Sequence, residues 1–435
     1  MWLDQLMLWG SMVILILWGC PITYAIGIVS VVAAWFVWGG MGGIFLVATT
    51  AAEVTTLSLL LAIPLFVFMA KILEISGIAE ELFEVMYVWF GRLHGGLAIG
   101  TTATGCILGA MMGASPASTA ILSSMAIKPM LDRHYDKRLV TGVIASSGAL
   151  AIIIPPSILM LVYSSLTGIS PGAMFIGGFI PGILIGLLFS IYIALKCHLN
   201  PSLGPAIKER YSLWGKIKVL KAVLLPFLII IAVLGSIYLG FTTPTEAAAV
   251  GAFTCFIIVI CRRRLNFKLL VVALNDTITV TVFIMWIAMS GYIFMRIVSA
   301  MGTPEMILQL VNRFPVSPYL ILGFMQIILI LLGCVLDPLG IMLITVPIFV
   351  PIANRLGFDP LFFGVLFIVN LATSFITPPF GLNLFVVRGM VPPGISMGDI
   401  VKGSMPFFFL EVLALIVLIV FPKLILVLPS YYIGR

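Results

Sequence analysis

Apolar stretches of about 17 to 25 residues recur along the whole chain, and short polar loops separate them. A stretch of this length can cross about 30 Å of hydrocarbon as a helix. The pattern predicts spans near residues 139–163, 174–195, 222–239 and 246–260, among others, and a first helix around Leu6–Leu17. That first stretch has no basic segment before it and no small-residue cleavage site, which predicts a retained helix rather than a secretory signal.

The composition places these stretches in lipid. Of the 435 residues, 62% are hydrophobic and only 9% are charged, whereas a soluble protein carries about 25% charged residues. The six cysteines and three histidines are scattered without metal-site spacing, so we expect no metal centre built from them. The chain is therefore predicted to be an all-α polytopic membrane protein in contact with the lipid bilayer.

Positive charge is confined to a few loops. Three basic segments, at residues 128–138, 196–221 and 262–268, carry most of the lysines and arginines. Basic loops of membrane proteins stay in the cytoplasm, and two predicted spans separate each segment from the next, which places all three on one side. The formal charge of +7 is thus explained by topology, and we expect no nucleic-acid partner.

The chain repeats itself at an offset of roughly 222 to 225 residues. Four matches occur in order: Pro21–Gly27 with Pro244–Gly251, Lys71-x5-Gly77-x2-Glu80 with Arg296-x5-Gly302-x2-Glu305, Ser115-Pro116 with Asp337-Pro338, and Ile154-Pro155-Pro156 with Thr377-Pro378-Pro379. They divide the chain into two units, residues 1–210 and 211–435. Duplicated halves with Gly/Pro-broken segments at corresponding places are typical of secondary transporters.

The charge pattern predicts that the two units are inverted in the membrane. Segment 262–268 corresponds to residues 39–52, which contain no Lys or Arg, and segment 128–138 corresponds to residues 351–360, which contain only Arg355. A basic loop in one unit thus matches an almost uncharged loop in the other. Inversion needs an odd number of crossings in each unit, and we count five if one segment of each does not cross.

Two apolar stretches carry the breaks expected of a segment that does not cross. Residues 100–127 are interrupted around Gly113–Ser118, and residues 320–350 are interrupted around Asp337–Gly340. Glycine and proline cost about 1 and 3 kcal/mol inside a helix, and non-helical backbone at membrane depth survives only against protein or a water-filled cavity. Each stretch is predicted to be a re-entrant helical hairpin; the alternative is an ordinary span kinked by proline.

A broken helix is predicted after each hairpin, at residues 139–163 and 361–390, interrupted by Pro155-Pro156 and Pro378-Pro379. Tandem proline removes two N–H donors and disfavours helix in the preceding residue. The freed carbonyls suit a hard cation such as Na⁺, and the start of the next half-helix suits a carboxylate. Two cation sites are thus predicted to flank one anion site.

The candidate binding residues come from the hairpin tips and the unwound segments. For Na⁺, the coupling ion expected in two or more copies, they are Gly113, Ser115, Pro155, Asp337, Gly340, Thr377 and Pro378. For a carboxylate substrate they are Ser115, Ser118, Ser157, Gly381 and Asn383. No residue is predicted to be catalytic.

Asp337 is the most informative single residue. It lies in a long apolar run, residues 327–344, where an ionisable group is expensive and usually functional. It can ligate a cation or carry a proton, and it can also cap the half-helix that begins at Pro338.

Other charged residues receive structural interpretations. The stretch Thr243-Pro244-Thr245-Glu246 has the pattern of a capping box, so Glu246 is interpreted as structural. Lys71 and Arg296 are expected near opposite faces, snorkelling or pairing with acids such as Glu74. The amphipathic segment Ala79–His94 is predicted to be an interfacial helix along the membrane. The aromatic run Phe407–Phe409, near Glu411, is interpreted as lipid-facing packing.

In its most specific motifs the chain resembles the large membrane subunit of TRAP (tripartite ATP-independent periplasmic) transporters, the DctM-like family. The matching stretches are Thr243-Pro-Thr-Glu-Ala-Ala-Ala-Val-Gly251, Leu336-Asp-Pro-Leu-Gly-Ile-Met-Leu-Ile-Thr-Val-Pro347, Thr377-Pro-Pro-Phe-Gly-Leu-Asn383, Ile154-Pro-Pro-Ser157 and Gly177-Gly-Phe-Ile-Pro-Gly182. The resemblance covers essentially the whole chain. One departure is the tip Gly113–Ser118, where the family often shows a Ser/Gly-rich run.

The resemblance implies an elevator-type carrier of the bacterial inner membrane that uses a Na⁺ gradient to import organic acids. Its implied partners are a small membrane subunit, expected here as a separate chain, and a soluble periplasmic substrate-binding protein. Dicarboxylates, sialic acids, sugar acids, keto acids and ectoine-like solutes are all candidate substrates.

Two other functions compete with this interpretation. A stand-alone Na⁺- or H⁺-coupled organic anion carrier would need no binding protein. An intramembrane hydrolase would need paired Asp residues, a Ser–His pair or clustered metal ligands, whereas Asp337 stands alone and the histidines are dispersed. The chain is therefore predicted not to be an enzyme. It also lacks a GxxxxGK[ST] nucleotide-binding loop, which is consistent with coupling to an ion gradient.

Overall fold

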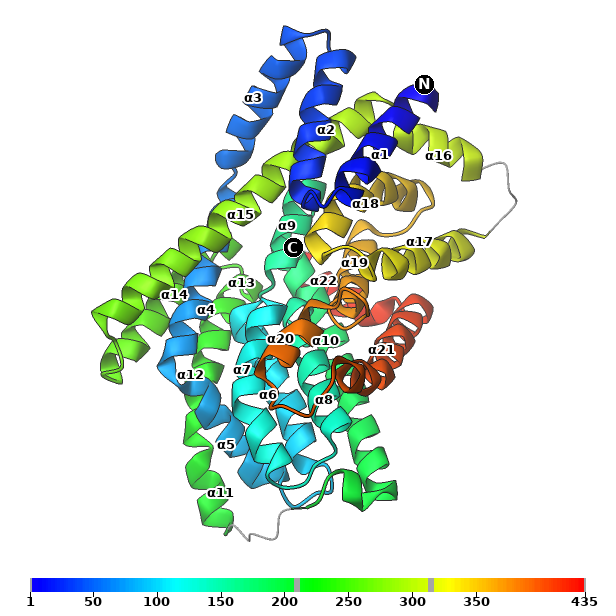
Figure 1. The fold of residues 1–435 in the computed structure, drawn as a ribbon. Helices are drawn as coiled ribbons and strands as arrows, with labels where there is room; N and C mark the ends of the chain where they lie inside the picture. The colour runs from blue at the N-terminus through cyan, green and yellow to red at the C-terminus, as the bar shows by residue number, and fades with distance from the viewer. Residues whose placement is uncertain (1, 207–211, 312–316, 434–435) are drawn as a thin grey trace.

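The computed structural model describes residues 2–206, 212–311 and 317–433, and every regular element in these ranges is a helix (Figure 1). The all-α prediction is confirmed. The predicted boundary between the units, at residues 210 and 211, lies outside the described residues, as do Lys208 and Arg210 of the second basic segment. The division into units 1–210 and 211–435 therefore stays a prediction.

The helices follow one another in nearly the same order in both parts of the chain. Before residue 206 they are α1 (Trp2–Leu17), α2 (Ile22–Val37), α3 (Met41–Thr55), η1 (Ser58–Leu61), α4 (Ala62–Ser76), α5 (Ile78–Phe90), α6 (Gly96–Met112), α7 (Ser115–Leu131), α8 (Lys137–Ala149), η2 (Leu150–Ile152), α9 (Ile158–Thr167), α10 (Pro171–Leu199) and η3 (Pro201–Leu203). After residue 212 they are α11 (Leu213–Val219), α12 (Lys221–Ile230), the π-helical η4 (Ile231–Gly235), α13 (Ser236–Tyr238), α14 (Pro244–Cys261), α15 (Phe267–Ala300), α16 (Thr303–Val311), α17 (Pro318–Gly333), α18 (Pro338–Arg355), α19 (Pro360–Ser374), α20 (Leu382–Met390), α21 (Met397–Val420) and α22 (Lys423–Ile433).

The predicted spans are present as helices. Within the described ranges, seven helical stretches are long and apolar enough to cross a membrane: Ser58–Ser76, Pro171–Leu199, Trp214–Tyr238, Pro244–Cys261, Phe267–Ala300, Pro338–Arg355 and Met397–Val420. The sequence placed three of these spans at residues 174–195, 222–239 and 246–260, within a few residues of these bounds except for the N-terminal end of Trp214–Tyr238. The chain is thus a multi-pass membrane protein.

The capping residues explain where several helices begin. Thr243 and Glu246 form the predicted capping box at the start of α14: the Thr243 amide donates to Glu246 Oε2 at 2.7 Å, and the Glu246 amide donates to Thr243 Oγ1 at 3.3 Å. The structural interpretation of Glu246 is confirmed. Ser396 and Asp399 form a second capping box at the start of α21, which the sequence analysis did not identify.

Corresponding helices exchange partners between the two parts. Helix α14 packs on α4, and their counterparts α2 and α15 pack on each other. In the same way α8 packs on α21 while α19 packs on α10, and α7 packs on α20 while α18 packs on α9. Each contact and its reciprocal at an offset of about 223 residues are what a two-fold relation between the halves requires.

Two ion pairs show the same reciprocity between the halves and indicate how the halves are oriented relative to each other. Lys71 Nζ lies 3.0 Å from Asp276 Oδ2 and 3.2 Å from Glu74 Oε2, while Arg296 Nη2 lies 2.5 Å from Glu53 Oε2. Lys71 corresponds to Arg296, and Glu53 to Asp276, at the offset of the repeat. Asp276 and Arg296 are about 30 Å apart on α15 at 1.5 Å per residue. Helix α15 therefore runs antiparallel to its counterpart α3–α4, and the two-fold relation exchanges the two ends of this pair. Inverted halves predict this arrangement.

Helix α5 is amphipathic, as the sequence predicted for this segment. Its buried side carries Ile78, Ala79, Leu82, Phe83, Val85 and Val88, while Glu80 and Glu84 are exposed. It packs against α6, α11 and α12. Its N-terminal half is fixed by Arg262, whose guanidinium makes two hydrogen bonds with the Glu81 carboxylate at 2.7 and 2.9 Å. This contact joins the third basic segment to α5.

The two predicted hairpins are present as helix–break–helix pairs. Helices α6 and α7 meet at Gly113 and Ala114, and helices α17 and α18 meet at residues 334–337. The first break is shorter than predicted, because Ser115 through Ser118 already form the first turn of α7. The arms extend two to five residues beyond the predicted bounds. That the hairpins enter and leave on one side of the membrane stays a prediction.

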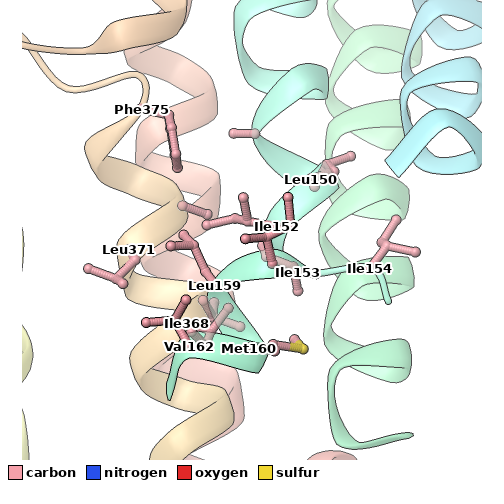
Figure 2. Close-up of a cluster of buried hydrophobic side chains, with 14 of the residues drawn as sticks. Leu150, Ile152, Ile153, Ile154, Leu159, Met160, Val162, Ile368, Leu371 and Phe375 are labelled. Carbon is pink, nitrogen blue, oxygen red and sulfur yellow. The ribbon is translucent and has the colours of Figure 1, made fainter. Parts of the chain in front are cut away.

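Both predicted broken helices are also present. Residues 153–157 separate η2 from α9, residues 375–381 separate α19 from α20, and the bonds Pro155–Pro156 and Pro378–Pro379 are cis. Apolar packing surrounds the first unwound segment: Figure 2 shows Ile152, Ile153 and Leu159 together with Ile368 and Leu371 of α19. Irregular backbone at membrane depth requires such cover by protein.

The interpretation of the aromatic run in α21 needs correction. Phe409 is 64% exposed, as lipid-facing packing requires, but Phe407 is only 1% exposed. The Phe407 ring packs edge-on against Phe189 and Tyr192 of α10, with ring centroids 5.0 and 5.4 Å apart. Glu411, one turn further on, is completely buried. The run was read as one surface, whereas neighbouring helical positions point in different directions.

Candidate cation and substrate site

The tip of the first hairpin lies against the unwound segment of its own half. Gly113 has a left-handed backbone (φ 63°), and a Cβ built on it would lie 2.3 Å from the Pro156 carbonyl oxygen. The Ile158 amide donates to the Gly113 carbonyl at 3.3 Å. Only glycine fits this conformation and this close approach. The contact brings Gly113 together with Pro156 and Ser157, as predicted.

Asn383, from the other half of the chain, reaches into this tip. Its amide nitrogen lies 2.9 Å from Ser115 Oγ and donates to the Ala145 carbonyl of α8 at 2.8 Å, and its Oδ1 lies 3.0 Å from Ser115 Oγ. All three residues are fully buried. Two predicted substrate residues, Ser115 and Asn383, are therefore hydrogen-bonded to each other across the two halves.

The second hairpin is joined to its own unwound segment in a similar way. The Phe380 amide donates to the Cys334 carbonyl at 3.2 Å, and the Gly381 amide donates to the Thr377 carbonyl at 2.9 Å. The segment 375–383 thus touches both tips, through Phe380 on one side and Asn383 on the other. This segment is the physical link between the two predicted cation sites.

Asp337 caps α18, one of the roles that its position predicted. Its Oδ2 accepts hydrogen bonds from the Leu339 and Gly340 amides, both at 3.1 Å. Within the described residues Oδ1 accepts no hydrogen bond, so one oxygen of the carboxylate is available to a cation. A Cβ built on Gly340 would lie 2.9 Å from that Oδ1, which brings these two candidates into contact.

Several oxygens around the unwound segments have no hydrogen-bond donor. Within the described ranges the carbonyls of Ile153, Ile154 and Pro155 accept none, and neither do those of Pro378 and Pro379. Thr377 Oγ1 donates to the Thr373 carbonyl at 2.6 Å, which leaves the oxygen lone pairs of Thr377 unused. Buried polar groups in folded proteins are normally paired, so these oxygens suit a cation.

Two buried hydroxyls near the first tip are also without a partner among the described residues. Ser118 lies one turn beyond Ser115 on α7, and Ser146 follows Ala145 on α8; neither Oγ makes a hydrogen bond. Ser118 was a predicted substrate residue, and Ser146 was missed. Ser157 is engaged locally, because its Oγ caps α9 by accepting from the Met160 amide at 3.4 Å.

The duplication also includes a polar pair that the sequence analysis missed. Ser147 Oγ donates to Thr102 Oγ1 at 3.2 Å, between α8 and α6. At the corresponding place, Asn370 Nδ2 donates to Gln326 Oε1 at 2.8 Å, between α19 and α17. Each pair fastens the first arm of a hairpin to the broken helix of the same half. Side chains of different size at matching positions hid this relation in the sequence.

A broken-helix pair joined to two hairpin tips within a bundle of membrane-spanning helices defines a membrane transporter. Solved structures, among them those of YdaH and MtrF, share this fold over most of the chain. The YdaH transporter of Alcanivorax borkumensis superposes with a TM-score of 0.67 at 13% identity, covering 89% of this chain and 90% of that one. MtrF of Neisseria gonorrhoeae, described as one of a class of antimetabolite efflux pumps, gives 0.56 at 14% identity, covering 87% and 84%.

The sequence defines the family. Residues 9–424 match the model of the tripartite ATP-independent periplasmic transporter, DctM component, and the chain belongs to that family. It is 32% identical over 381 residues to the C4-dicarboxylate TRAP transporter large permease protein DctM of Pseudomonas aeruginosa, covering 86% of each chain. The ectoine TRAP large permease TeaC of Halomonas elongata is 28% identical, covering 96% of this chain and 97% of TeaC.

The sialic acid TRAP large permease SiaM of Vibrio cholerae is also 28% identical, covering 86% of this chain and 87% of that one. The predicted family and the predicted location in the bacterial inner membrane are thus confirmed. The named substrates of the relatives differ in chemistry, although the relatives are similarly distant from this chain.

Proposed function

We propose that this chain imports an organic acid across the bacterial inner membrane, driven by a Na⁺ gradient and supplied by a soluble periplasmic binding protein. The observation that carries the proposal is the segment 375–383, which touches both hairpin tips and, at Pro378 and Pro379, carries carbonyl oxygens free of hydrogen bonds. A cation bound at these oxygens orders the segment and both tips together. The cation and the carboxylate site are thereby coupled.

The proposed cation ligands fall into two groups. The first is Gly113, Ser115 and Pro155 with the free carbonyls of residues 153–155, and the second is Asp337, Gly340, Thr377 and Pro378. The carboxylate lies between them, near Ser115, Ser118, Ser157, Gly381 and Asn383, where hydroxyls, an amide and the starts of α9 and α20 can donate hydrogen bonds.

The proposed movement is of the elevator type. The hairpins and broken helices form one body, because α7 binds α20 and α8 binds α21 across the halves. Helices α2, α4, α14 and α15 form the static scaffold. The two bodies slide past each other while the bound cation keeps the tips closed on the substrate. The proposed partners are a small membrane subunit and a soluble periplasmic binding protein, which is consistent with the word tripartite in the family's name.

The test is uptake into proteoliposomes that contain this chain with its small membrane subunit. An inward Na⁺ gradient is imposed, and labelled dicarboxylates, sialic acids, sugar acids, keto acids and ectoine are offered with and without the candidate binding protein. Uptake that requires both Na⁺ and the soluble protein is the expected result. Uptake without the soluble protein would instead establish a stand-alone carrier, and uptake under a K⁺ gradient alone would rule out Na⁺ coupling.

Two variants test the second cation site. Asp337→Asn retains a good N-cap but removes the charge, and Thr377→Val removes the hydroxyl oxygen. We expect the Na⁺ concentration for half-maximal uptake to rise at least about tenfold, equivalent to about 1.4 kcal/mol of binding free energy. Ser123→Ala is the control, because among the described residues Ser123 Oγ bonds only the Thr119 carbonyl of its own helix. Unchanged Na⁺ activation in both variants would refute the assignment.

A further inference from the structure

An acidic side chain outside the two hairpins and the two broken helices is buried at membrane depth. Glu411 lies in α21, is 0% exposed, and neither carboxyl oxygen has a hydrogen-bond partner within the described residues. No ion pair involves it among those residues. The mechanism proposed above does not use it, so its burial needs another explanation.

The register between α8 and α21 gives the depth of Glu411. Arg138 pairs with Asp399, and a Cβ built on Gly142 would lie 2.1 Å from the Gly403 carbonyl oxygen. The two helices therefore run in the same direction with a fixed spacing. The same spacing places Glu411 level with Leu150, where α8 ends and the 3-10 helix η2 begins.

Helix α10 supports this placement independently. It runs opposite to α8: a Cβ built on Gly182 would contact Ile154, and one on Gly186 would lie 3.9 Å from Leu150 Cδ1. Its aromatic contacts with Phe407 come later, at Phe189 and Tyr192. Both registers thus place Glu411 at the level of the C-terminal end of α8, one short 3-10 turn before the carbonyls proposed for the first cation site.

The charged groups of the surrounding helices lie elsewhere. The elements packed on α21 are α8, α10, α19 and α20. Their titratable side chains are Lys137 and Arg138 of α8, Tyr192, Lys196, Cys197 and His198 of α10, and Arg388 of α20, while α19 has none. On α21 itself there are Asp399 and Lys402.

Most of these groups are engaged with other partners, and Lys402 is nine residues, about 13 Å, from Glu411 along α21. Lys137 and Arg138 bind Asp399, which is about 18 Å from Glu411 along α21. Lys196 donates to the Tyr192 hydroxyl at 2.8 Å, and Arg388 donates to the Ile395 carbonyl. No cation therefore neutralises Glu411 from a neighbouring helix. An isolated buried carboxylate is so costly that such a group takes up a proton instead.

We propose that Glu411 is a proton-binding site of the transport cycle, neutral in this arrangement and ionised when the first unwound segment shifts. The proton binds a carboxyl oxygen of Glu411 and is released to water when the carboxyl ionises, and a cation bound at the carbonyls of residues 153–155 favours the ionised form. Proton binding at Glu411 and cation binding at these carbonyls thus oppose each other electrostatically. This inference rests on the proposed function, and it adds proton dependence to a carrier driven by Na⁺.

Infrared spectroscopy tests the protonation directly, without transport. The purified protein is compared with Glu411→Gln, which has the same shape and cannot ionise. The expected difference spectrum contains the carbonyl stretch of a protonated carboxylic acid, and this band weakens when Na⁺ is added. Absence of the band, or a band insensitive to Na⁺, would overturn the proposal.

Uptake gives the second readout. With a fixed Na⁺ gradient, uptake by the unaltered protein should change about tenfold across two pH units around the midpoint of its profile, whereas Glu411→Gln should transport with a flat profile. Glu80→Gln, which removes an exposed carboxylate, should retain the pH dependence. Coincident profiles of the unaltered protein and Glu411→Gln would refute the inference while leaving Na⁺-driven uptake intact. If neither protein transports any organic acid, the proposed function fails, and the infrared band alone decides the protonation.

Discussion

The hydrogen bonds of Asn383 offer the most direct test of how the two halves are joined. Asn383→Ala removes the donor to the Ala145 carbonyl and both contacts with Ser115 Oγ. Ser115 Oγ is then buried without a partner, at about 1–3 kcal/mol, and the Ala145 carbonyl, which keeps its helical partner in α8, loses a second hydrogen bond worth about 1 kcal/mol. Hydrogen bonds between membrane helices have measured values near the lower end of this range, so we expect a loss of about 2 kcal/mol.

A double-mutant cycle isolates the contact itself. Reversible unfolding in mixed detergent micelles is measured for Asn383→Ala, Ser115→Ala and the double variant. The coupling free energy should be about 0.6 to 1.7 kcal/mol, the average and maximum found for such pairs in membranes. Ser123→Ala combined with Asn383→Ala should show no coupling, because Ser123 bonds only its own helix. Additive effects of Ser115→Ala and Asn383→Ala would refute the claim that this bond links the halves.

Three further predictions follow from close contacts. Gly142→Ala should destabilise the protein by about 1–3 kcal/mol, because the new Cβ would lie 2.1 Å from the Gly403 carbonyl oxygen; Gly389→Ala, with open space around it, should not. Gly113→Ala should lower the thermal midpoint of unfolding more than Gly168→Ala. Both glycines have a left-handed backbone, but only at Gly113 would the new Cβ also meet a carbonyl oxygen. Equal shifts of the midpoint would contradict the packing of this tip. Arg296→Glu and Glu53→Arg should each lose about 0.2–1 kcal/mol, and the two together should recover stability; a double variant no better than the singles would disprove the pairing.

The breaks in the helices were predictable because their causes are local. Gly113 and the tandem prolines at Pro155 and Pro378 weaken regular helix locally, and the structure interrupts the helices at these positions, whereas the single prolines Pro181 and Pro406 stay inside α10 and α21. The exact bounds of the first break were harder to predict, because proline is tolerated in the first turn of a helix. Ser115 and Pro116 therefore belong to α7 rather than to the tip.

The partners of polar residues could not be predicted from the sequence. Ser115 and Asn383 were both candidates, but they are 268 residues apart, and an amide can bond to many groups. The pairing of Asp399 with Lys137 and Arg138 was missed for the same reason. Long-range contacts depend on how helices pack, and local propensity does not contain that information.

The burial of Glu411 was detectable, although it was missed. Gly403, Phe407, Glu411 and Ala414 follow one another at helical intervals of three or four residues, and Phe407, Glu411 and Ala414 are 0–1% exposed. Because Phe407–Phe409 were assigned to one surface as neighbours in the sequence, Glu411 was grouped with lipid-facing aromatic residues. A helical period is the signal that separates these two faces.

The counterparts α15 and α3–α4 differ in mechanical character. Helix α15 runs unbroken for 34 residues with an ion pair near each end, whereas the equivalent stretch of the first half is interrupted between Thr55 and Ser58. A continuous helix is stiff and keeps its two ends at a constant separation, while an interrupted helix can bend at the break. The helices proposed as the static scaffold are thus continuous in one half, whereas in the other half the stretch leading into α4 is interrupted at residues 56–57, which makes those residues the place to look for bending.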